Sequence, residues 1–254
     1  MEIRVLGCSG GIGKGLRTTS FLVGDEILID AGSGVSDLTI EEMRKIRHIF
    51  LTHSHLDHVH CIPLLVDSIF DSIKEPIVIH AQLATIQALQ SHIFNWVIWP
   101  DFSSLPHPEK PVMVFDPFEA GDTVLIGEIA FEAVLVEHIV PTVGIIVKNS
   151  AGVFAFSGDT ATNDSLWDRL NQLERLDILV VESAFSNRER ELCRKSKHYC
   201  PETLAEDLKK LKHQPLIHLT HAKPGEEALI LNEVKELIKD RTISQLHGGE
   251  LFKI

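Results

Sequence analysis

Short apolar runs bounded by glycine recur through the first fifty residues and predict β-strands. They lie at 2–7, 19–24 and 26–32, and a fourth run, at 45–53, ends where a group of histidines begins. Such runs between turn residues are typical of strands. The glycine-rich segment 7–15 has neither the GK[ST] of a P-loop nor a dinucleotide-binding fingerprint, so we interpret it as a turn that lines a cleft.

Apolar residues at helical spacing first appear after residue 60. From here strands and helices alternate to the C-terminus. The helices are expected at 60–75, 81–94, 165–173, 201–212 and 225–240. The strands are expected at 76–80, 112–117, 122–138, 142–159, 176–183 and 215–221.

Residues 95–111 fit neither periodicity and are rich in proline and aromatic residues. With their flanks they form segment 92–118, which we interpret as a lid or an interface insertion. There is no internal repeat and no linker of shifted composition. Residues 1–254 are therefore predicted to form a single layered α/β domain, with mixed sheets inside and helices outside.

Composition narrows the possible partners and compartments. The net charge of −12 disfavours binding to nucleic-acid backbones. A membrane span would need an apolar run of about 18 residues, and the chain has none; the opening MEIRVLG does not resemble a secretory signal. The four scattered cysteines form no C-x-x-C pair. We expect a cytoplasmic protein with reduced thiols that binds neither a membrane nor nucleic acid.

The stretch IFLTHSHLDHVH, residues 49–60, contains the densest group of metal-binding side chains. His53, His55, Asp57 and His58 form an H-x-H-x-D-H pattern. Imidazole and carboxylate groups suit zinc or another first-row divalent ion. Four such ligands within six residues cannot all converge on one tetrahedral ion. We interpret the turn as shared by two ions; the alternative is a polar loop with surface histidines.

Three further candidate ligands each follow a later apolar run. They are His138 in VEHIVP, Asp159 in FSGDT and His221 in HLTHAKP. Strand ends along one edge of a layered fold converge in space, so residues distant in sequence can meet there. Asp159 is the only carboxylate of the three, and a carboxylate can bridge two cations about 3.5–4 Å apart.

In their order along the chain, these seven residues resemble the ligand set of the metallo-β-lactamase superfamily. The resemblance covers essentially the whole chain and implies a four-layer αββα fold with two mixed β-sheets sandwiched by helices. It implies two divalent ions per chain, zinc or else manganese or iron. It also assigns the ligands: His53, His55 and His138 to one ion, Asp57, His58 and His221 to the other, Asp159 to both, and Asp30 of LIDAGSG to a supporting role.

Within that superfamily, the chain looks most like the class II cyclic-nucleotide phosphodiesterases. The segments that carry this likeness are 92–102, 137–147, 156–160, 181–187, 198–211 and 219–224. The resemblance implies hydrolysis of 3′,5′-cyclic nucleotides, cyclic AMP or cyclic GMP or both, to 5′-nucleotides by a metal-bound hydroxide, in a homodimer. Two alternatives remain: an endonuclease of the ribonuclease Z type that processes tRNA 3′ ends, and a non-catalytic nucleotide-binding module on the same fold.

Three residues are expected to move protons. By resemblance, Asp57 is the base-like partner of the hydroxide. His198 shortly precedes Pro201, where a helix is expected to begin, so it is our candidate for protonating the leaving alkoxide, with Glu182 holding its tautomer. Alternatively, His198 is a capping or surface residue and Glu182 a buried charge at a strand end.

The aromatic segment is expected to recognise the base. Trp99, together with Trp96 and Phe102, offers stacking faces worth about 1–3 kcal/mol per base, and Asn95 offers an amide. Equally, these aromatic residues could belong to the core or to a dimer interface. Thr160 and Ser183, in the segments FSGDT and VESAFSN, complete the candidate substrate-binding residues.

Overall fold

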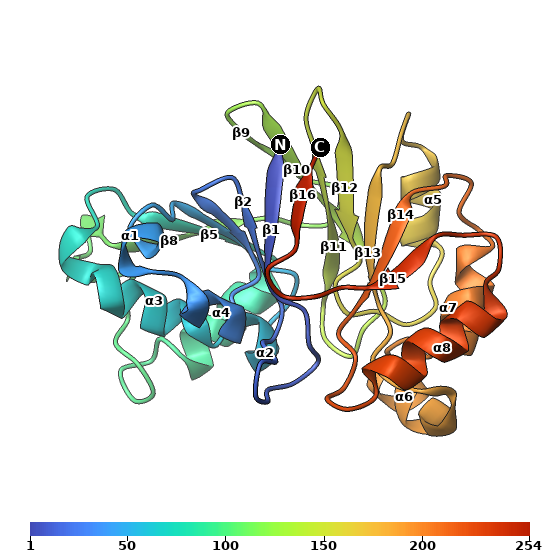
Figure 1. Ribbon diagram of the computed structural model, residues 1–254. Coiled ribbons are helices and arrows are strands. Elements are labelled where there is room, and N and C mark those ends of the chain that lie inside the picture. The colour runs from blue at the N-terminus through green and yellow to red at the C-terminus, as the bar shows by residue number, and fades with distance from the viewer.

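A computed structural model describes residues 1–254 and contains two seven-stranded sheets (Figure 1). The first has the order β16 (Leu251–Lys253), β1 (Glu2–Gly7), β2 (Ser20–Val23), β3 (Ile27–Ile29), β4 (His48–Phe50), β5 (Ile77–Ala81), β8 (Met113–Pro117). The second has the order β15 (Ile243–Gln245), β14 (Leu216–Thr220), β13 (Ile178–Glu182), β12 (Val153–Phe156), β11 (Val143–Lys148), β10 (Ile129–Leu135), β9 (Thr123–Ile126).

Both sheets are mixed in the same way. From β16 to β3 the neighbouring strands are antiparallel, and from β3 to β8 they are parallel. In the second sheet the strands from β9 to β12 are antiparallel and those from β12 to β15 parallel. The carboxyl ends of the parallel strands therefore gather along one edge of each sheet, where residues from different strands can meet.

Helices cover the outer face of each sheet (Figure 1). On the first sheet these are α1 (Ile40–Met43), α3 (Cys61–Ile69) and α4 (Leu83–His92), and on the second α5 (Ser165–Asn171), α7 (Pro201–Leu208) and α8 (Glu227–Leu237). The short helices α2 (Leu56–Val59) and α6 (Arg190–Ser196) lie at the lower edge of Figure 1. None of the helices is both long and apolar enough to span a lipid bilayer. The predicted four-layer αββα architecture is confirmed.

Three buried apolar clusters separate these four layers. The middle cluster joins the two sheets, with Phe21 and Phe50 from the first and Phe131 and Phe154 from the second. The outer clusters pack each sheet against its helices. Burial of apolar surface on both faces of a sheet explains the nearly continuous apolar runs in the parallel strands.

Several predicted boundaries were wrong. The helix expected at 60–75 begins earlier, as α2, and α3 ends at Ile69, followed by a 3-10 turn, η2 (Phe70–Ser72). The strand expected at 122–138 is a hairpin of β9 and β10, because Gly127 adopts a positive φ of 57° between them. The run at 142–159 is likewise the hairpin of β11 and β12. The elements that were not predicted are all short. They are α1, α6, β15, β16, β6 (Pro106–His107), β7 (Lys110–Pro111), η1 (Ser33–Asp37) and η3 (Asn187–Glu189).

Segment 92–118 is only partly a surface insertion. Its last part forms β8, the edge strand of the first sheet, and Phe94 and Phe102 are buried in the cluster under α3. Trp96 and Val97, in contrast, are exposed. β8 and the two buried phenylalanines therefore belong to the packed domain, and the prediction of a lid or an interface concerns the exposed part around Trp96 and Val97.

Candidate functional site

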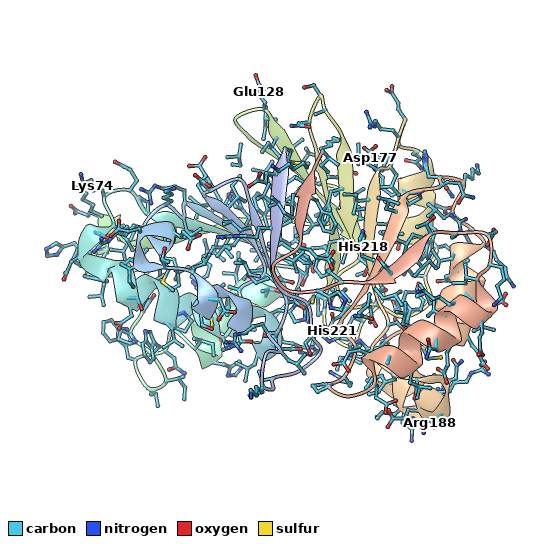
Figure 2. The ribbon with its side chains drawn as sticks, viewed as in Figure 1. Lys74, Glu128, Asp177, Arg188, His218 and His221 are labelled. Atoms are coloured by element: carbon cyan, nitrogen blue, oxygen red, sulfur yellow. The ribbon has the colours of Figure 1, made fainter.

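Segments that follow strands β4, β10, β12 and β14 deliver seven metal-binding side chains to one edge of the molecule. We call the seven the donor cluster: His53, His55, Asp57, His58, His138, Asp159 and His221. His53 and His55 follow β4, and α2, which carries Asp57 and His58, begins immediately afterwards. The other three follow β10, β12 and β14. Figure 2 labels His221 in the lower centre, between the two halves of the fold.

Asp159 lies at the centre of the donor cluster. Its Oδ2 is 3.3 Å from His221 Nε2 and 3.4 Å from His58 Nε2. The same oxygen is 3.7 Å from His53 Nε2 and 4.0 Å from His138 Nε2. One carboxylate oxygen therefore contacts imidazoles from both halves of the cluster.

The donors fall into two groups whose ligand atoms all lie within 4.8 Å of one another. One consists of His53, His55, His138 and Asp159, and the other of Asp57, His58 and His221. A third such set combines Asp159 and His221 with His198. These groups could hold metal ions, as expected of neutral imidazoles and carboxylates gathered in a small volume.

Unpartnered polar atoms support this interpretation. His53 Nε2, His58 Nε2 and Asp159 Oδ1 are buried and have no hydrogen-bond partner. Leaving such atoms unsatisfied is costly, so a buried group of them calls for a missing partner. The chemistry of the donor set and these unpartnered atoms fit a divalent metal ion.

Burial keeps several imidazoles in the form that binds metal. It lowers the pKa of His53 well below its usual range, that of His138 to about 4 and that of His221 to about 3. Burial opposes ionisation of Asp159, but the charge and hydrogen bond of His58 help to hold the pKa of Asp159 low. Burial also opposes protonation of His58, yet the Asp159 and Asp30 carboxylates raise the pKa of His58 above its usual range, so this ring would lose its proton on binding a metal ion. Neutral imidazole next to ionised carboxylate is the state that a metal ion requires.

Hydrogen bonds orient the imidazole rings. Asp30 Oδ2 accepts from His58 Nδ1 at 2.7 Å and is itself held by the Thr52 hydroxyl at 2.8 Å. His138 Nδ1 donates to the Lys197 carbonyl at 2.9 Å. In both histidines this leaves Nε2 directed to the cluster, an arrangement typical of metal-binding histidines. Asp30 thus occupies the supporting position expected of it.

His198 and Glu182 form a buried pair beside the donor cluster. His198 Nδ1 lies 2.6 Å from Glu182 Oε1, and its ring stacks on His221 with centroids 5.3 Å apart. Burial raises the pKa of Glu182, but backbone amides of Thr160, Ala184 and Tyr199 also donate to it, so we assign it as ionised. Burial opposes protonation of His198, but the Glu182 carboxylate raises the pKa of His198 above its usual value.

Comparison with known proteins identifies the family. The beta-lactamase superfamily domain matches residues 25–239. The chain belongs to this superfamily. Its two mixed sheets with flanking helices are the metallo-β-lactamase fold, and the family membership expected from the sequence is confirmed.

Three similar proteins place the chain within the superfamily. A probable 3′,5′-cyclic-nucleotide phosphodiesterase of Yersinia pestis is 26% identical, over 92% of this chain and 83% of the relative. The structure of unliganded yeast PDE1 covers 98% of both chains with a TM-score of 0.83 and 18% identity. Human tRNase Z, short form, covers 100% of this chain and 99% of its own, with a TM-score of 0.70 and 15% identity. The two structural likenesses concern the fold.

The four candidate substrate-binding residues differ in their burial and in their hydrogen-bond partners. The Thr160 hydroxyl is buried and bonded to the Ala161 carbonyl, while its amide supports Glu182. Ser183 is fully buried, and its hydroxyl has no partner. The Asn95 carbonyl oxygen accepts from Val97 and Ile98 within its own turn. Trp99 packs against the cluster under α3, as in the alternative considered above.

A contact that sequence reasoning missed joins the glycine-rich segment to the donor cluster. His221 N donates to the Cys8 carbonyl at 2.8 Å, and Gly10 N to the Ala222 carbonyl at 3.0 Å. A Cβ on Gly10 would lie 2.2 Å from the His221 carbonyl oxygen, so only glycine fits. Lys223 Nζ donates to the Gly10 carbonyl at 2.9 Å and lies over the ring of Phe185. The one available signal was the unusual run of glycines at 10, 11 and 13.

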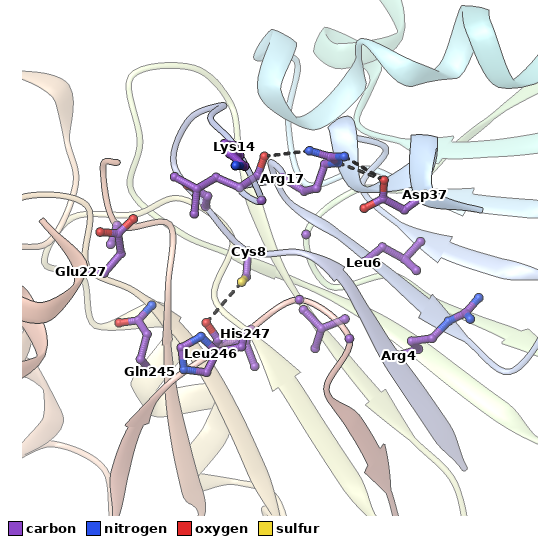
Figure 3. A pocket seen from close by; sticks show the side chains of 18 of the residues that line it. Arg4, Leu6, Cys8, Lys14, Arg17, Asp37, Glu227, Gln245, Leu246 and His247 are labelled. Atoms are coloured by element: carbon purple, nitrogen blue, oxygen red, sulfur yellow. Dashed lines mark hydrogen bonds and ion pairs between the residues drawn. The ribbon is translucent and has the colours of Figure 1, made fainter. Parts of the chain in front are cut away.

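The same glycine-rich segment lines a cavity of about 790 Å³ (Figure 3). Cys8 lies on its wall and its thiol donates to the Leu246 carbonyl, while Arg17 and Asp37 form an ion pair at 3.0 Å. None of the donor cluster lines the cavity, but Ala222, which follows His221, does. The interpretation of segment 7–15 as a turn lining a cleft agrees with this geometry.

Proposed function

We propose that this protein is a dinuclear-metal phosphodiesterase that hydrolyses 3′,5′-cyclic nucleotides, cyclic AMP or cyclic GMP or both, to 5′-nucleotides. The main support is the position of Asp159 Oδ2, within 4.0 Å of imidazoles from both donor groups, with the His198–Glu182 pair alongside. The substrate class is supported by the phosphodiesterase relative, which is similar over most of both chains.

In this proposal, His53, His55 and His138 hold one ion, Asp57, His58 and His221 the other, and Asp159 both. Zinc is our first choice, with manganese or iron as alternatives. When bound, the two ions supply an activated water and neutralise the charge of the phosphodiester. The protein would keep that water oriented through Asp57, whose carboxylate is 30% exposed and lies 3.7 Å from His221 Nε2.

The leaving O3′ of the nucleotide needs a proton, and His198 is proposed to provide it. Because Glu182 engages Nδ1, Nε2 is the nitrogen that carries a transferable proton. The raised pKa of His198 keeps that proton in place near neutral pH. The water oxygen ends on phosphorus and the Nε2 proton ends on O3′, which yields the 5′-nucleotide.

Lys223 is proposed to add positive charge near the phosphate. Its ammonium group interacts electrostatically with Asp57, His198 and His221. The cavity of Figure 3, whose lining includes Lys14 and Ala222, is a candidate place for the nucleoside. Asn95 and Trp99, which do not line it, are the alternative contacts for the base. A Lys14→Ala variant should raise KM if the nucleoside uses the cavity, and Trp99→Ala should raise it if the base stacks on that ring.

The direct test is a product assay on protein loaded with zinc or manganese. The proposal expects chromatographic release of a 5′-nucleotide from cyclic AMP or cyclic GMP. Absence of turnover of both, with two bound ions per chain verified by elemental analysis, would refute it. A screen that includes cyclic dinucleotides would then reveal a different substrate.

A second candidate, cleavage of tRNA precursors, is favoured by the full-length structural likeness to human tRNase Z. The net charge of −12 opposes it, because tRNA binding requires a basic surface. Binding of a precursor tRNA at low salt, followed by cleavage, would support this alternative. A non-catalytic nucleotide-binding module would instead bind cyclic nucleotide without turnover.

The proposed setting is the cytoplasm, and the proposed assembly is a homodimer. All four cysteines are free thiols, which suits a reducing compartment. Trp96, Val97 and Ile98 are exposed at neighbouring positions and could contact a second subunit. Sedimentation of the purified protein would decide between monomer and dimer.

A further inference from the structure

Two cysteines flank His198 in the segment between α6 and α7. Cys193 lies in α6 and Cys200 is the N-cap residue of α7. Both are buried in a small cluster with Ala184 and Phe185. Neither contributes to the donor cluster, and the activity proposed above gives them no role.

Cys193 forms hydrogen bonds with both the backbone amide and the backbone carbonyl of His198. Its thiol donates to the His198 carbonyl at 2.9 Å, and its carbonyl accepts from the His198 amide at 3.1 Å. Lys197, between them, adopts a left-handed φ of 53°, which reverses the chain. Any movement of the Cys193 sulfur therefore acts directly on the backbone of His198.

Cys200 is the more reactive partner of the two. As N-cap of α7, its sulfur accepts from the backbone amide at the third helical position, and Pro201 follows it. The neighbouring Cys193 side chain and these amides, acting against burial, lower the pKa of Cys200 to about 6, while the pKa of Cys193 is raised. A thiolate beside a protonated thiol at a helix N-terminus is the arrangement of reactive dithiols.

Access to the buried pair requires little unfolding. Cys193 is the only buried residue of α6, and its helical neighbours Leu192 and Arg194 are exposed. An exposed surface ion pair, Arg190 with Glu202 at 2.9 Å, connects α6 to α7. Such pairs contribute only about 0–1 kcal/mol. Short elements with few buried contacts open locally at low cost.

We propose that Cys193 and Cys200 are an oxidisable dithiol that a hydroperoxide converts to a disulfide, and that this disulfide displaces His198. One peroxide oxygen first oxidises the Cys200 sulfur to a sulfenic acid, with release of water. The Cys193 sulfur then attacks it, forms the S–S bond and expels a second water. The two thiols lose two electrons and two protons, and hydrogen peroxide is reduced to two molecules of water.

The displacement follows from the bond length. A disulfide brings the two sulfurs to about 2.05 Å, closer than any non-bonded contact within their cluster, and it removes the thiol donor from the His198 carbonyl. His198 would then lose its alignment with Glu182 Oε1. A misplacement of about 1 Å can cost a hundredfold in rate. We expect a loss of at least about tenfold in turnover on the same basis.

The test treats metal-loaded protein with hydrogen peroxide, alkylates the remaining thiols after unfolding and maps the peptides by mass. We expect a peptide pair linked through Cys193 and Cys200, lighter by about 2 Da for the two lost hydrogens, and turnover that returns on addition of dithiothreitol. Cys193→Ser and Cys200→Ser should prevent both the link and the loss. Cys61→Ser is the matched control, because this buried thiol has no thiol partner, and it should behave as wild type.

Oxidation of Cys8 would show that the peroxide treatment was effective. If the disulfide between Cys193 and Cys200 is then absent, these cysteines are not the oxidisable pair that we propose. A link that forms without changing turnover would overturn its effect on His198. The effect on turnover rests on the proposed function, but the mass measurement does not. If cyclic nucleotides are not substrates, the disulfide is still detected or excluded.

Discussion

Individual side chains have different roles at the donor edge, the edge of the two sheets that carries the donor cluster. Asp159 contacts imidazoles of both donor groups, whereas His198 contacts a carboxylate outside them. Removing a ligand should therefore have a different consequence from removing the proton donor. Because all of these groups lie in one cluster, activity alone cannot distinguish the two, and metal content is the informative measurement.

His221→Ala is expected to lose metal, because the second ion would keep only Asp57, His58 and the shared Asp159 as ligands. His198→Ala should retain its metal and lose about 100- to 10,000-fold in kcat, the usual contribution of general acid catalysis. Elemental analysis after gel filtration, combined with turnover of cyclic AMP, distinguishes the two. If both variants lose metal equally, His198 is a ligand rather than the acid.

The pH dependence of kcat tests the charge state of His198. The protonated form is the active one, so kcat should fall as pH rises through the pKa of His198, which Glu182 raises above the usual value of about 6.5. Glu182→Gln removes the stabilising negative charge and should shift this alkaline limb to lower pH. An unchanged limb in Glu182→Gln would show that another group titrates.

At the scale of elements, the loops that follow strands β1 and β14 support each other at the site. The segment 8–11 contacts the chain at 220–224 through backbone hydrogen bonds, and His221 there adopts a positive φ of 63°. A non-glycine residue in this region is unusual and is held by its surroundings. The glycine-rich loop is therefore part of the support for His221.

Gly10→Ala is expected to weaken metal binding and destabilise the fold by about 1–3 kcal/mol, as overpacking does. The new Cβ would meet the His221 carbonyl oxygen at 2.2 Å, and backbone must move. Gly13→Ala is the matched control, because its Cβ would meet only the flexible end of Leu16, at 3.2 Å. Thermal unfolding and metal titration report both effects. Equal behaviour of the two variants would contradict the proposed support.

At the scale of the whole molecule, the donor edge is where the two halves meet. His53, His55, Asp57 and His58 belong to the first half, and His138, Asp159 and His221 to the second. Bound ions would therefore join the two sheet systems across the middle of the sandwich. Without them, the unpartnered atoms of His53 and Asp159 remain a local cost.

Removal of metal with a chelator should consequently lower the melting temperature as well as abolish turnover. A ligand present at a thousand times its Kd stabilises the native state by about 4 kcal/mol. Zinc added back should restore the melting temperature, measured in a calorimetric scan, and turnover, measured in the product assay. Magnesium, which prefers oxygen ligands, should restore neither. A chelated protein that melts at the same temperature would argue against ions that join the halves.

Much of the fold could be predicted because burial leaves a local trace. Most strands of both sheets, though not the edge strands β15 and β16, and the helices α5, α7 and α8 appeared as apolar runs or helical spacing, because they pack against a sheet face. The exposed helix α6 left no such pattern, because only Cys193 is buried. The turn at Gly127, which separates β9 from β10, depends on how the two strands pair, and the periodicity of apolar residues does not reveal that pairing.

The sequence by itself determined which donors the protein has: seven imidazoles and carboxylates, each at or just after a predicted strand end, in the order of a known superfamily. Tertiary structure decided which groups remain available to a ligand. It buried Thr160 behind Glu182, used the Asn95 oxygen within its own turn and packed Trp99 on the core. It also brought Gly10 against His221 and Cys193 beside Cys200. The physical reason is that residue type and spacing set local chemistry and burial, whereas contacts between distant segments depend on how the layers pack.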